Sequence, residues 1–202
     1  MFANNLAPSP VADLVAATLL PPEQQAAAAA TLGIADRSEL ARHGCKGPGA
    51  AEWLVALGLP IPPAPNSWLP LDDGGRIARL GFTEFLIEGP AALIAPLAAA
   101  PRGPGVYPVL RQDAAFVLAG SRLDELLRQS CSVNFRALDL AARPVVLTSM
   151  VGVGVTAIPE LRAGRPTLRI WCDGTYGHYL WETLLDIAGD LGGGAVVARS
   201  ID

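Results

Sequence analysis

The spacing of apolar and polar positions predicts a first series of short strands and helices from about residue 32 onward. In GAAEWLVAL the apolar residues Trp53, Leu54 and Leu57 fall on one helix face. The predicted elements are a strand over 39–45, a helix over 49–57, two strands within 67–80, a strand over 84–89 and a helix over 90–100. Turn-forming residues at 72–75 join the two strands of 67–80.

A second series follows the linker PRGPG at 101–105. Its predicted elements are a strand over 114–120, a helix over 121–130, strands over 143–158 and 166–172 separated by a turn at 162–165, and a helix over 176–193. Ser121 is expected to cap the first of these helices. The last helix shows the clearest apolar stripe, formed by Leu180, Trp181, Leu184, Leu185 and Ala188.

The two series resemble each other, which predicts two β-α-β-β-α units in an α+β fold. Four positions align at one constant offset: Gly47, Glu52, Trp53 and Leu54 against Gly120, Glu125, Leu126 and Leu127. We expect antiparallel sheets, each with helices packed on one face. The chain is divided into an N-terminal arm over 1–30 and one domain over 31–202, with repeats at about 32–100 and 104–200.

Composition excludes several classes of protein. Of 202 residues, 51% are hydrophobic and only 17% are charged, which indicates a folded chain rather than a disordered one. The net charge is −4 and no basic cluster occurs, so nucleic acid is not an expected partner. Three scattered cysteines without a CxxC argue against a disulfide framework or a zinc site and favour a reducing compartment.

Nothing in the sequence predicts secretion or a membrane anchor. No basic residue precedes Arg37, so the positive segment of a signal peptide is lacking. The most apolar run, over 89–101, is short and is interrupted by prolines. We therefore expect a cytoplasmic protein that does not contact a membrane.

The stretch GCKGPGAAEW at 44–53 poses the question of a phosphate-binding loop. In a P-loop the lysine follows the last glycine, whereas Lys46 precedes Gly47 and Gly49 here. Pro48 also lacks an N–H that a phosphate would use, and it suits the first turn of a helix. A tight turn between strand and helix is the favoured interpretation.

Other reactive residues favour structural roles. His43 and Cys45 would face one side of a strand, but nothing supplies a third residue to orient them as base and nucleophile. Cys172 and His178 bracket a strand-to-helix turn, yet Asp173 would oppose a thiolate there. We therefore assign no catalytic residue and no metal ligand, and the cofactor-binding residues remain unknown.

Three further features of the sequence concern acidic residues near turns and glycines within a strand. Asp72 and Asp73, beside two glycines, are expected to be turn residues rather than an acid–base pair. Asp36 could cap a turn, pair with Arg37 or Arg42, or line a cleft, and these alternatives stay open. The two glycines in MVGVGVTAIP indicate a bulge or a close approach of backbone or ligand, and the bulge is favoured.

Segments over 32–191 together resemble a known family. LGIADRSELARHGCKGPGAAEWL resembles the opening of the aminomethyltransferase (glycine-cleavage T-protein) folate-binding fold. GLPIPPAPNSW and RLGFTEFLIEG are more similar to the gamma subunit of heterotetrameric sarcosine oxidase. CSVNF and TLRIWCDGTYGHYLWETLLDIA resemble later segments of the same family. The resemblance implies a two-repeat, ferredoxin-like arrangement.

The resemblance also implies a function, that of a non-catalytic accessory subunit in a complex that demethylates sarcosine or a related N-methyl amine. In such a complex this chain would bind no cofactor and would pack against the larger folate-binding subunit. FAD, FMN, NAD and tetrahydrofolate are expected on the larger partner subunits. A stand-alone folate-binding aminomethyltransferase-like protein is the alternative.

One departure from the family pattern supports the accessory role. Active aminomethyltransferases carry acidic residues in a GG-x-x-DD pattern after the turn. The matching positions here, after Gly74 and Gly75, are Ala78 and Arg79. An arginine stays protonated and cannot act as a general base. The carboxylate that would act on a folate amine is therefore missing from these positions.

Overall fold

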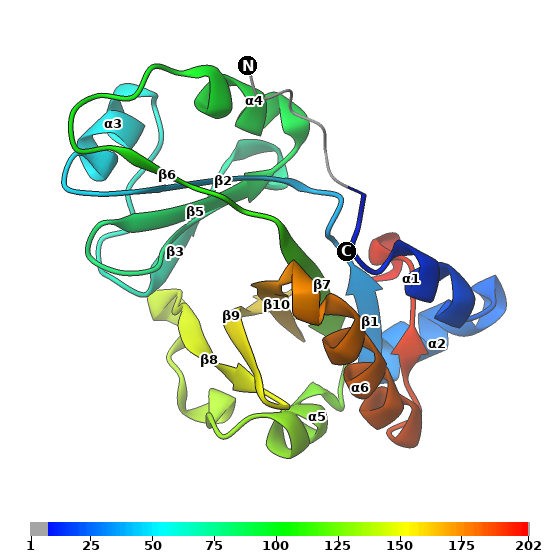
Figure 1. Ribbon diagram of the computed structural model, residues 1–202. Helices are drawn as coiled ribbons and strands as arrows, with labels where there is room; N and C mark the ends of the chain where they lie inside the picture. The colour runs from blue at the N-terminus through cyan, green and yellow to red at the C-terminus, as the bar shows by residue number, and fades with distance from the viewer. Residues whose placement is uncertain (1–7, 202) are drawn as a thin grey trace. The chain divides into compact units, whose positions relative to one another are not determined.

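The computed structural model describes residues 8–201 and shows a mixed α+β chain with two β-sheets (Figure 1). Contacts within the chain group these residues into two units. The first unit comprises residues 40–112 and 142–145, and the second comprises residues 8–39, 113–141 and 146–201. No helix within residues 8–201 is both long and apolar enough to cross a membrane.

The first unit is built on a five-stranded sheet in the order β3-β4-β5-β2-β6. Its elements are β2 (Ala41–Lys46), α3 (Ala50–Ala56), β3 (Ser67–Pro70), the 3₁₀ turn η1 (Asp72–Gly74), β4 (Arg76–Arg79), β5 (Glu84–Gly89), α4 (Ala91–Ala99) and β6 (Tyr107–Val109). All of its strand pairs are antiparallel. The turn expected at 72–75 is confirmed, with Gly74 at φ +77°.

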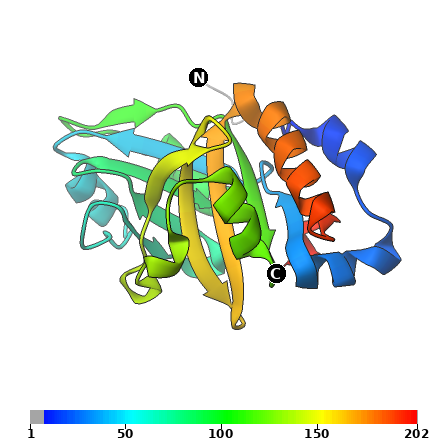
Figure 2. The same cartoon turned by 90° about the horizontal axis from the view of Figure 1, so that it is seen from below.

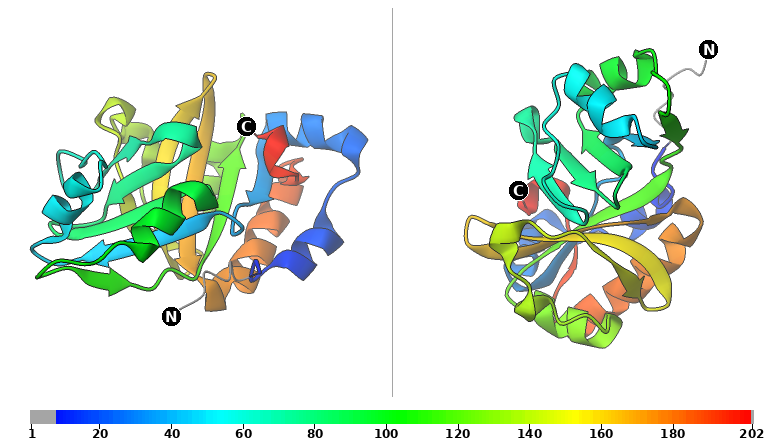
Figure 3. Two further views of the ribbon diagram at one scale, coloured as in Figure 1. Left: turned by 90° about the horizontal axis from the view of Figure 1, so that it is seen from above. Right: turned by 90° about the vertical axis from the view of Figure 1, so that its left-hand side faces the viewer.

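Helices α3 and α4 cover the same face of this sheet (Figure 3). Alternate residues of β2, β4 and β5 point toward them, as the two-residue period of a strand requires. The buried core contains Cys45, Ala50, Trp53, Leu54, Ile77, Phe85, Ile87, Ile94, Leu97 and Val106. The helix-free face instead carries buried charges, where Arg42 and Arg76 lie on either side of Glu88.

The second unit is built on a six-stranded sheet in the order β11-β1-β7-β10-β9-β8. Its strands are β1 (Gly33–Asp36), β7 (Asp113–Ala119), β8 (Val146–Met150), β9 (Val153–Arg162), β10 (Arg165–Asp173) and β11 (Gly194–Ala195). Its α-helices are α1 (Ala12–Thr18), α2 (Pro22–Leu32), α5 (Leu123–Ser130) and α6 (Gly177–Asp190). The 3₁₀ turns that follow β7 in the chain are η2 (Phe135–Ala137), η3 (Leu140–Ala142), η4 (Gly174–Tyr176) and η5 (Ala198–Ser200).

Helices α5 and α6 cover one face of this sheet, with α6 lying along the strands (Figure 2). The helix predicted over 176–193 is α6, and its expected stripe supplies the buried Leu180, Trp181, Leu184 and Ala188. The Trp181 ring meets the edge of Phe116 on β7, with the ring centroids 5.2 Å apart. This contact joins the longest helix of the unit to the middle of its sheet.

Two expectations about this sheet were wrong. Helix α2 packs on the opposite face, where Ala28 and Ala29 contact Val117 and Ala119, so this sheet has helices on both faces. Strand β11 pairs with β1 in parallel, so the sheet is mixed rather than purely antiparallel. Residues 8–30 of the N-terminal arm contain α1 and most of α2, and residues 1–7 lie outside the described structure.

The two sheets follow the same order around β2 and β7. Each of these strands pairs on one side with the last strand of a three-stranded meander, β5 or β10. On its other side it pairs with a strand that precedes the other unit in the chain: β6 beside β2, and β1 beside β7. Each unit thus has three strands between its helices, one more than the β-α-β-β-α pattern, and the ferredoxin-like arrangement is not confirmed.

Several local predictions need correction. The strand expected over 143–158 is the hairpin β8–β9, whose register runs unbroken up to a turn at 151–152, so the favoured bulge is absent there. Helix α5 begins at Leu123 after Arg122, and no side chain caps it, so Ser121 is not its cap. Helix α3 begins at Ala50, so Pro48 lies in the preceding turn rather than in the helix.

Candidate functional site

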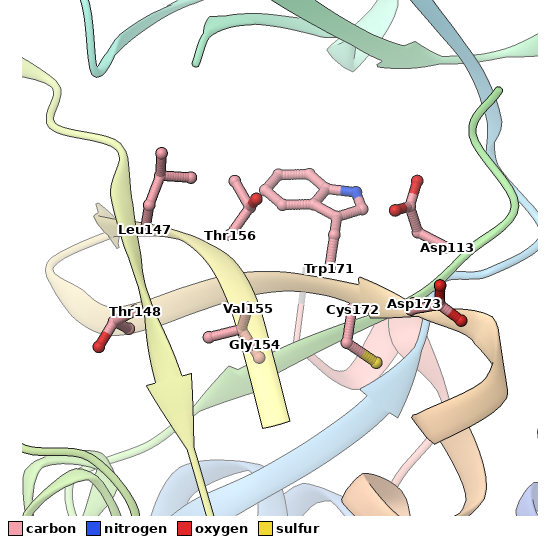
Figure 4. A pocket seen from close by; sticks show the side chains of 9 residues that line it. All are labelled: Asp113, Leu147, Thr148, Gly154, Val155, Thr156, Trp171, Cys172 and Asp173. Carbon is pink, nitrogen blue, oxygen red and sulfur yellow. The ribbon is translucent and has the colours of Figure 1, made fainter. Parts of the chain in front are cut away.

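An open cavity of about 390 Å³ lies in the second unit where four strands come together (Figure 4). It crosses the sheet from β8 through β9 and β10 to the start of β7. The lining residues are Asp113, Leu147, Thr148, Gly154, Val155, Thr156, Trp171, Cys172 and Asp173. We call it the Trp171 cavity. Gly154 leaves it open, because a Cβ at this position would have no atom within 4 Å.

Two carboxylates mark the β7 side of the Trp171 cavity. Asp113 and Asp173 are direct partners in the antiparallel register of β7 and β10. Asp173 caps η4, where its Oδ1 accepts hydrogen bonds from the Thr175 N–H at 2.9 Å and the Thr175 hydroxyl at 2.6 Å. These bonds lower the pKa of Asp173, so its carboxylate stays ionised near neutral pH.

An aromatic ring forms the middle of the cavity. Figure 4 shows the side chains of Trp171, Thr156 and Leu147 extending from the same face of the sheet. The guanidinium carbon of Arg169 lies 5.4 Å from the centroid of the Trp171 indole, a cation–π distance. Trp171 lines the cavity but is otherwise buried, so most of its ring packs against the protein.

Cys172 belongs to the core beneath the cavity and is a poor nucleophile. Burial raises the pKa of its thiol to about 12, and the charges of Asp113 and Asp173 act in the same direction. The thiolate needed for attack is therefore almost absent at neutral pH. His178 is exposed on α6 while Cys172 is buried, which supports the interpretation that Cys172 is a core residue rather than a reactive thiolate.

The Trp171 cavity can therefore offer negative charge and an aromatic edge, but no activated nucleophile. Sequence reasoning singled out Cys172 and Asp173 and missed Asp113, Thr156 and Trp171. The alternation in RIWCDG places Trp171 and Asp173 on one face, which was an available signal. Asp113 joins them only through the register of β7 against β10, which the sequence does not reveal.

His43 and Cys45 lie on the helix-covered face of the first sheet. The His43 ring packs against Trp53, with centroids 5.7 Å apart. Burial, and then the charge of Arg102, lower the pKa of His43. Burial raises the pKa of Cys45 to about 11. Both groups are therefore neutral near pH 7, which supports the interpretation as core residues.

The backbone of the glycine loop is already bonded to other carbonyls. Gly47 N–H donates to the Thr83 carbonyl at 3.1 Å, and Gly49 N–H donates to the Gly105 carbonyl at 3.2 Å. A phosphate would need these same donors. The loop after Lys46 is thus a tight turn, as the sequence indicated.

Of the alternatives for Asp36, capping is the one seen. Its Oδ1 accepts bonds from the Ser38 N–H at 2.9 Å and the Ser38 hydroxyl at 2.6 Å. Asp36 ends β1, and its turn leads toward β2. The Ser38 hydroxyl in turn accepts a bond from Ala115 N–H at 3.0 Å, which fixes the turn to β7.

The two positions where the family pattern has carboxylates are structural. Ala78 is buried on β4. Arg79 donates from its guanidinium to the Phe82 carbonyl at 2.8 Å and to the Pro62 carbonyl at 3.3 Å. The guanidinium carbon also lies 5.9 Å from the centre of the Phe85 ring. Arg79 therefore holds the loops around β4 together.

A second cavity, of about 530 Å³, lies beside the CSVNF segment. We call it the Cys131 cavity; it is lined by Asp124, Leu127, Arg128, Cys131, Ser132, Val133, Asn134, Phe135 and Arg136. Asp124 pairs with Arg128 and, at 2.8 Å, with Arg136. Within residues 8–201, no cluster of three or more His, Cys, Asp or Glu side chains is arranged to hold a metal ion.

Comparison with known proteins finds two similar solved structures. Heterotetrameric sarcosine oxidase from Corynebacterium sp. U-96, in complex with pyrrole 2-carboxylate, has a chain that superposes with a TM-score of 0.70 at 23% identity. That match covers 92% of this chain and 96% of the other. Glycine cleavage system aminomethyltransferase T from Bartonella henselae superposes with a TM-score of 0.65 at 18% identity. No protein-family model and no curated protein sequence matches.

The two comparisons differ in how much of the other chain is matched. The match to the aminomethyltransferase covers 91% of this chain but only 53% of the other, so this chain spans about half the length of that protein. It spans nearly all of the sarcosine oxidase chain. At these identities the likeness establishes a shared fold, and it agrees with the resemblance noted in the sequence.

Proposed function

We propose that this chain is a non-catalytic, gamma-type subunit of a complex like heterotetrameric sarcosine oxidase. In this complex it packs against a larger folate-binding subunit. FAD, FMN, NAD and tetrahydrofolate belong to the larger subunits, and the reaction of the complex is oxidative demethylation of sarcosine or a related N-methyl amine. The role of this chain is to complete and stabilise the assembly.

The observation that carries the proposal is the extent of the structural match. A chain of the heterotetrameric sarcosine oxidase is matched over 96% of its length, whereas the aminomethyltransferase is matched over about half. This is the relation expected of a subunit that corresponds to one part of the aminomethyltransferase fold. The fold alone does not define an activity, so residues must support the assignment.

The candidate reactive residues favour an accessory role. Ala78 and Arg79 stand where the family pattern has carboxylates, and Arg79 is engaged with loop carbonyls. Burial holds Cys45 and Cys172 in the thiol form. A protein partner, rather than a small-molecule reaction, is therefore the function these residues favour.

The test is a native purification of the tagged chain from its own organism, followed by an absorbance spectrum of the eluate. The proposal predicts stoichiometric co-elution of larger, yellow subunits, and oxidation of sarcosine or another N-methyl amine by the eluate. A parallel purification with an unrelated tagged protein controls for adventitious flavoproteins. The chain alone should have a lower melting temperature than the chain in the complex, because a partner that binds only the folded state stabilises it.

A colourless, single-chain eluate would contradict the accessory role. A folate titration then separates the alternative, a stand-alone folate-binding protein: tetrahydrofolate would raise the melting temperature of the isolated chain. An unchanged melting temperature in that titration would exclude the alternative as well.

A further inference from the structure

Within residues 8–201, three of the four sheet edges are partly covered or interrupted. An edge strand displays unpaired N–H and C=O groups, and proteins usually cover or interrupt it. At β3, Trp68 N–H donates to the Arg143 carbonyl at 3.0 Å. At β11, Leu20 N–H donates to the Ala195 carbonyl at 3.0 Å. The three-residue β6 contains Pro108, which has no N–H to offer.

The fourth edge, β8, has none of these protections. Val146–Met150 contains neither proline nor a charged residue, and among residues 8–201 it pairs only with β9. Leu147 on this strand is 53% exposed. A five-residue, uncharged edge strand is a template for pairing with another extended segment.

The hairpin turn determines which groups of β8 face outward. The two turn residues, 151–152, have φ values of 44° and 85°, as in a two-residue type I′ turn. Met150 and Val153, which flank the turn, then form a hydrogen-bonded pair, and such pairs alternate along the strands. Leu147 and Ser149 therefore direct their N–H and C=O groups away from β9. Among residues 8–201, no other backbone group bonds to them.

Both cavities adjoin this edge strand, and the Trp171 cavity is lined by Leu147 on one face of β8 and by Thr148 on the other. Leu147 lines the Trp171 cavity, with its side chain on the same face as Trp171 and Thr156 (Figure 4). On the other face, the Thr148 hydroxyl lies 3.6 Å from the Cys131 sulfur of the Cys131 cavity. A strand added beside β8 would place its alternate side chains next to these two cavities. This combination of free backbone groups and side-chain recesses is typical of strand addition.

Charge specifies the added strand further. At the Cys131 cavity the cations of Arg128 and Arg136 share the single carboxylate of Asp124, which leaves one positive charge in excess. Both arginine side chains are largely exposed. An acidic side chain on the added strand would therefore be favoured on this face, and an apolar side chain would be favoured beside Leu147.

We propose that β8 binds an extended segment of the larger partner subunit as an additional, seventh strand of this sheet. The segment places an apolar side chain next to Leu147 and an acidic side chain toward Arg128 and Arg136. The identity of the partner rests on the proposed function, whereas the docking edge rests on the geometry of β8. A second copy of this chain fits less well, because antiparallel β8–β8 pairing would bring two arginine clusters together on one face.

Ser149→Pro is the variant that tests the edge. Proline removes the outward N–H of residue 149 and leaves every hydrogen bond between β8 and β9 in place, a position where edge strands tolerate proline. Ser149→Ala is the matched control, because it removes the same hydroxyl and keeps the N–H. A melting temperature of Ser149→Pro close to that of Ser149→Ala verifies that the fold is intact.

Two measurements are made on the native complex. Hydrogen exchange of the wild-type chain should slow about tenfold or more at the amides of Leu147 and Ser149 when the partner is bound. Affinity for the partner should fall about tenfold for Ser149→Pro and remain unchanged for Ser149→Ala, because one backbone bond is lost only in the first. The exchange measurement requires no variant, so it decides the matter even if Ser149→Pro fails to fold.

The outcomes separate this inference from the proposed function. A yellow complex with unchanged exchange at Leu147 and Ser149, or one that Ser149→Pro forms as readily as Ser149→Ala, overturns the docking edge and leaves the proposed function standing. A chain that purifies without any larger polypeptide overturns both. A particle of two identical chains that Ser149→Pro splits into single chains assigns the edge to a second copy and overturns the partner named here.

Discussion

Gly47 and Gly120 occupy equivalent turns in the two units. Gly47 follows β2 with φ of 114°, and Gly120 follows β7 with φ of 139°. A Cβ on Gly47 would lie 2.2 Å from the Gly105 carbonyl oxygen, and one on Gly120 would lie 2.3 Å from the Thr31 carbonyl oxygen. Gly105 lies two residues before β6 and Thr31 two residues before β1. In both units, the segment that leads into the neighbouring strand, β6 or β1, therefore passes directly over the glycine.

This relationship predicts that Gly47→Ala and Gly120→Ala are both severely destabilising. The cost has two parts: an alanine in a positive-φ conformation, and a collision with backbone that cannot rotate away. We expect each variant to lose about 3 kcal/mol or more of unfolding free energy. Urea unfolding followed by circular dichroism measures this loss.

Gly74 and Gly154 supply matched controls for the glycine prediction. Gly74 has φ of +77° with no atom within 4 Å of an added Cβ, so Gly74→Ala should cost only about 1 kcal/mol. Gly154 lies in a strand with open space around it, so Gly154→Ala should be neutral or slightly stabilising. Equal losses for Gly47→Ala and Gly74→Ala would mean that the close approach to Gly105 is unimportant.

Burial of Cys45 predicts a loss of stability at high pH. The pKa of its thiol rises from 9.0 to about 11 on folding, so the unfolded chain releases the proton first as pH increases. The stabilising contribution is complete below pH 9 and is lost as pH rises toward 11, where the loss reaches about 2 kcal/mol. Denaturant unfolding at pH 8 and pH 11 should show a smaller alkaline loss for Cys45→Ala than for the wild type.

The same burial predicts selective labelling of the three cysteines. Cys45 and Cys172 are buried, whereas Cys131 is half-buried beside a cavity. Under native conditions at pH 7.5, a maleimide should modify Cys131 at least tenfold faster than the other two, since reaction requires both access and thiolate. Peptide mass spectrometry locates the label. Fast modification of Cys172 would show that the region around β10 opens readily.

The predictable parts of the fold are those with a strong local signal. The apolar stripe of α6 and the alternating residues of β5 and β10 each repeat often enough to define their element. The strands β1, β6 and β11 were not predicted, because they contain only two to four residues and, unlike the equally short β3 and β4, are not joined to a neighbour by a recognisable hairpin turn. Their strand character comes from the neighbour with which they pair rather than from their own sequence.

The sequence predicts a single strand where the hairpin β8–β9 lies, because its turn lacks the usual turn residues. Type I′ turns usually contain Asn-Gly, and a sequence search for turns relies on such pairs. Here the first turn residue is Val151, a β-branched residue at φ 44°. Valine rarely adopts this conformation, so its presence gave no turn signal. The Trp171 cavity was missed for a different reason: Asp113 and Asp173 meet only through strand register.

His43 predicts a loss of stability in mild acid. Burial and the charge of Arg102 place the pKa of His43 below the ordinary value of 6.5. As pH falls below 6.5, the unfolded chain therefore binds a proton at this histidine before the folded chain does. Stability is therefore fully present above pH 6.5 and declines as pH falls below it. His43→Phe, which keeps a ring against Trp53, should flatten thermal stability between pH 7 and pH 5.

The second histidine of the chain provides the control for that measurement. His178 is exposed on α6, so His178→Gln is the matched control for the replacement of a histidine. A melting temperature that falls as steeply in acid for His43→Phe as for His178→Gln would contradict the prediction.

Glu88 predicts the largest charge effect in the first unit. Its carboxylate is 1% exposed and lies 3.9 Å from the Arg42 Nε and 4.0 Å from the Arg76 Nε. Glu88→Gln removes a buried negative charge that faces two guanidinium groups, which should cost about 3 kcal/mol of unfolding free energy. Glu84 lies on the same strand but is 38% exposed, with its carboxylate 2.7 Å from Arg111. Glu84→Gln should cost less than about 1 kcal/mol. Denaturant unfolding of both variants in one buffer compares them, and equal losses would show that burial does not strengthen the Glu88 cluster.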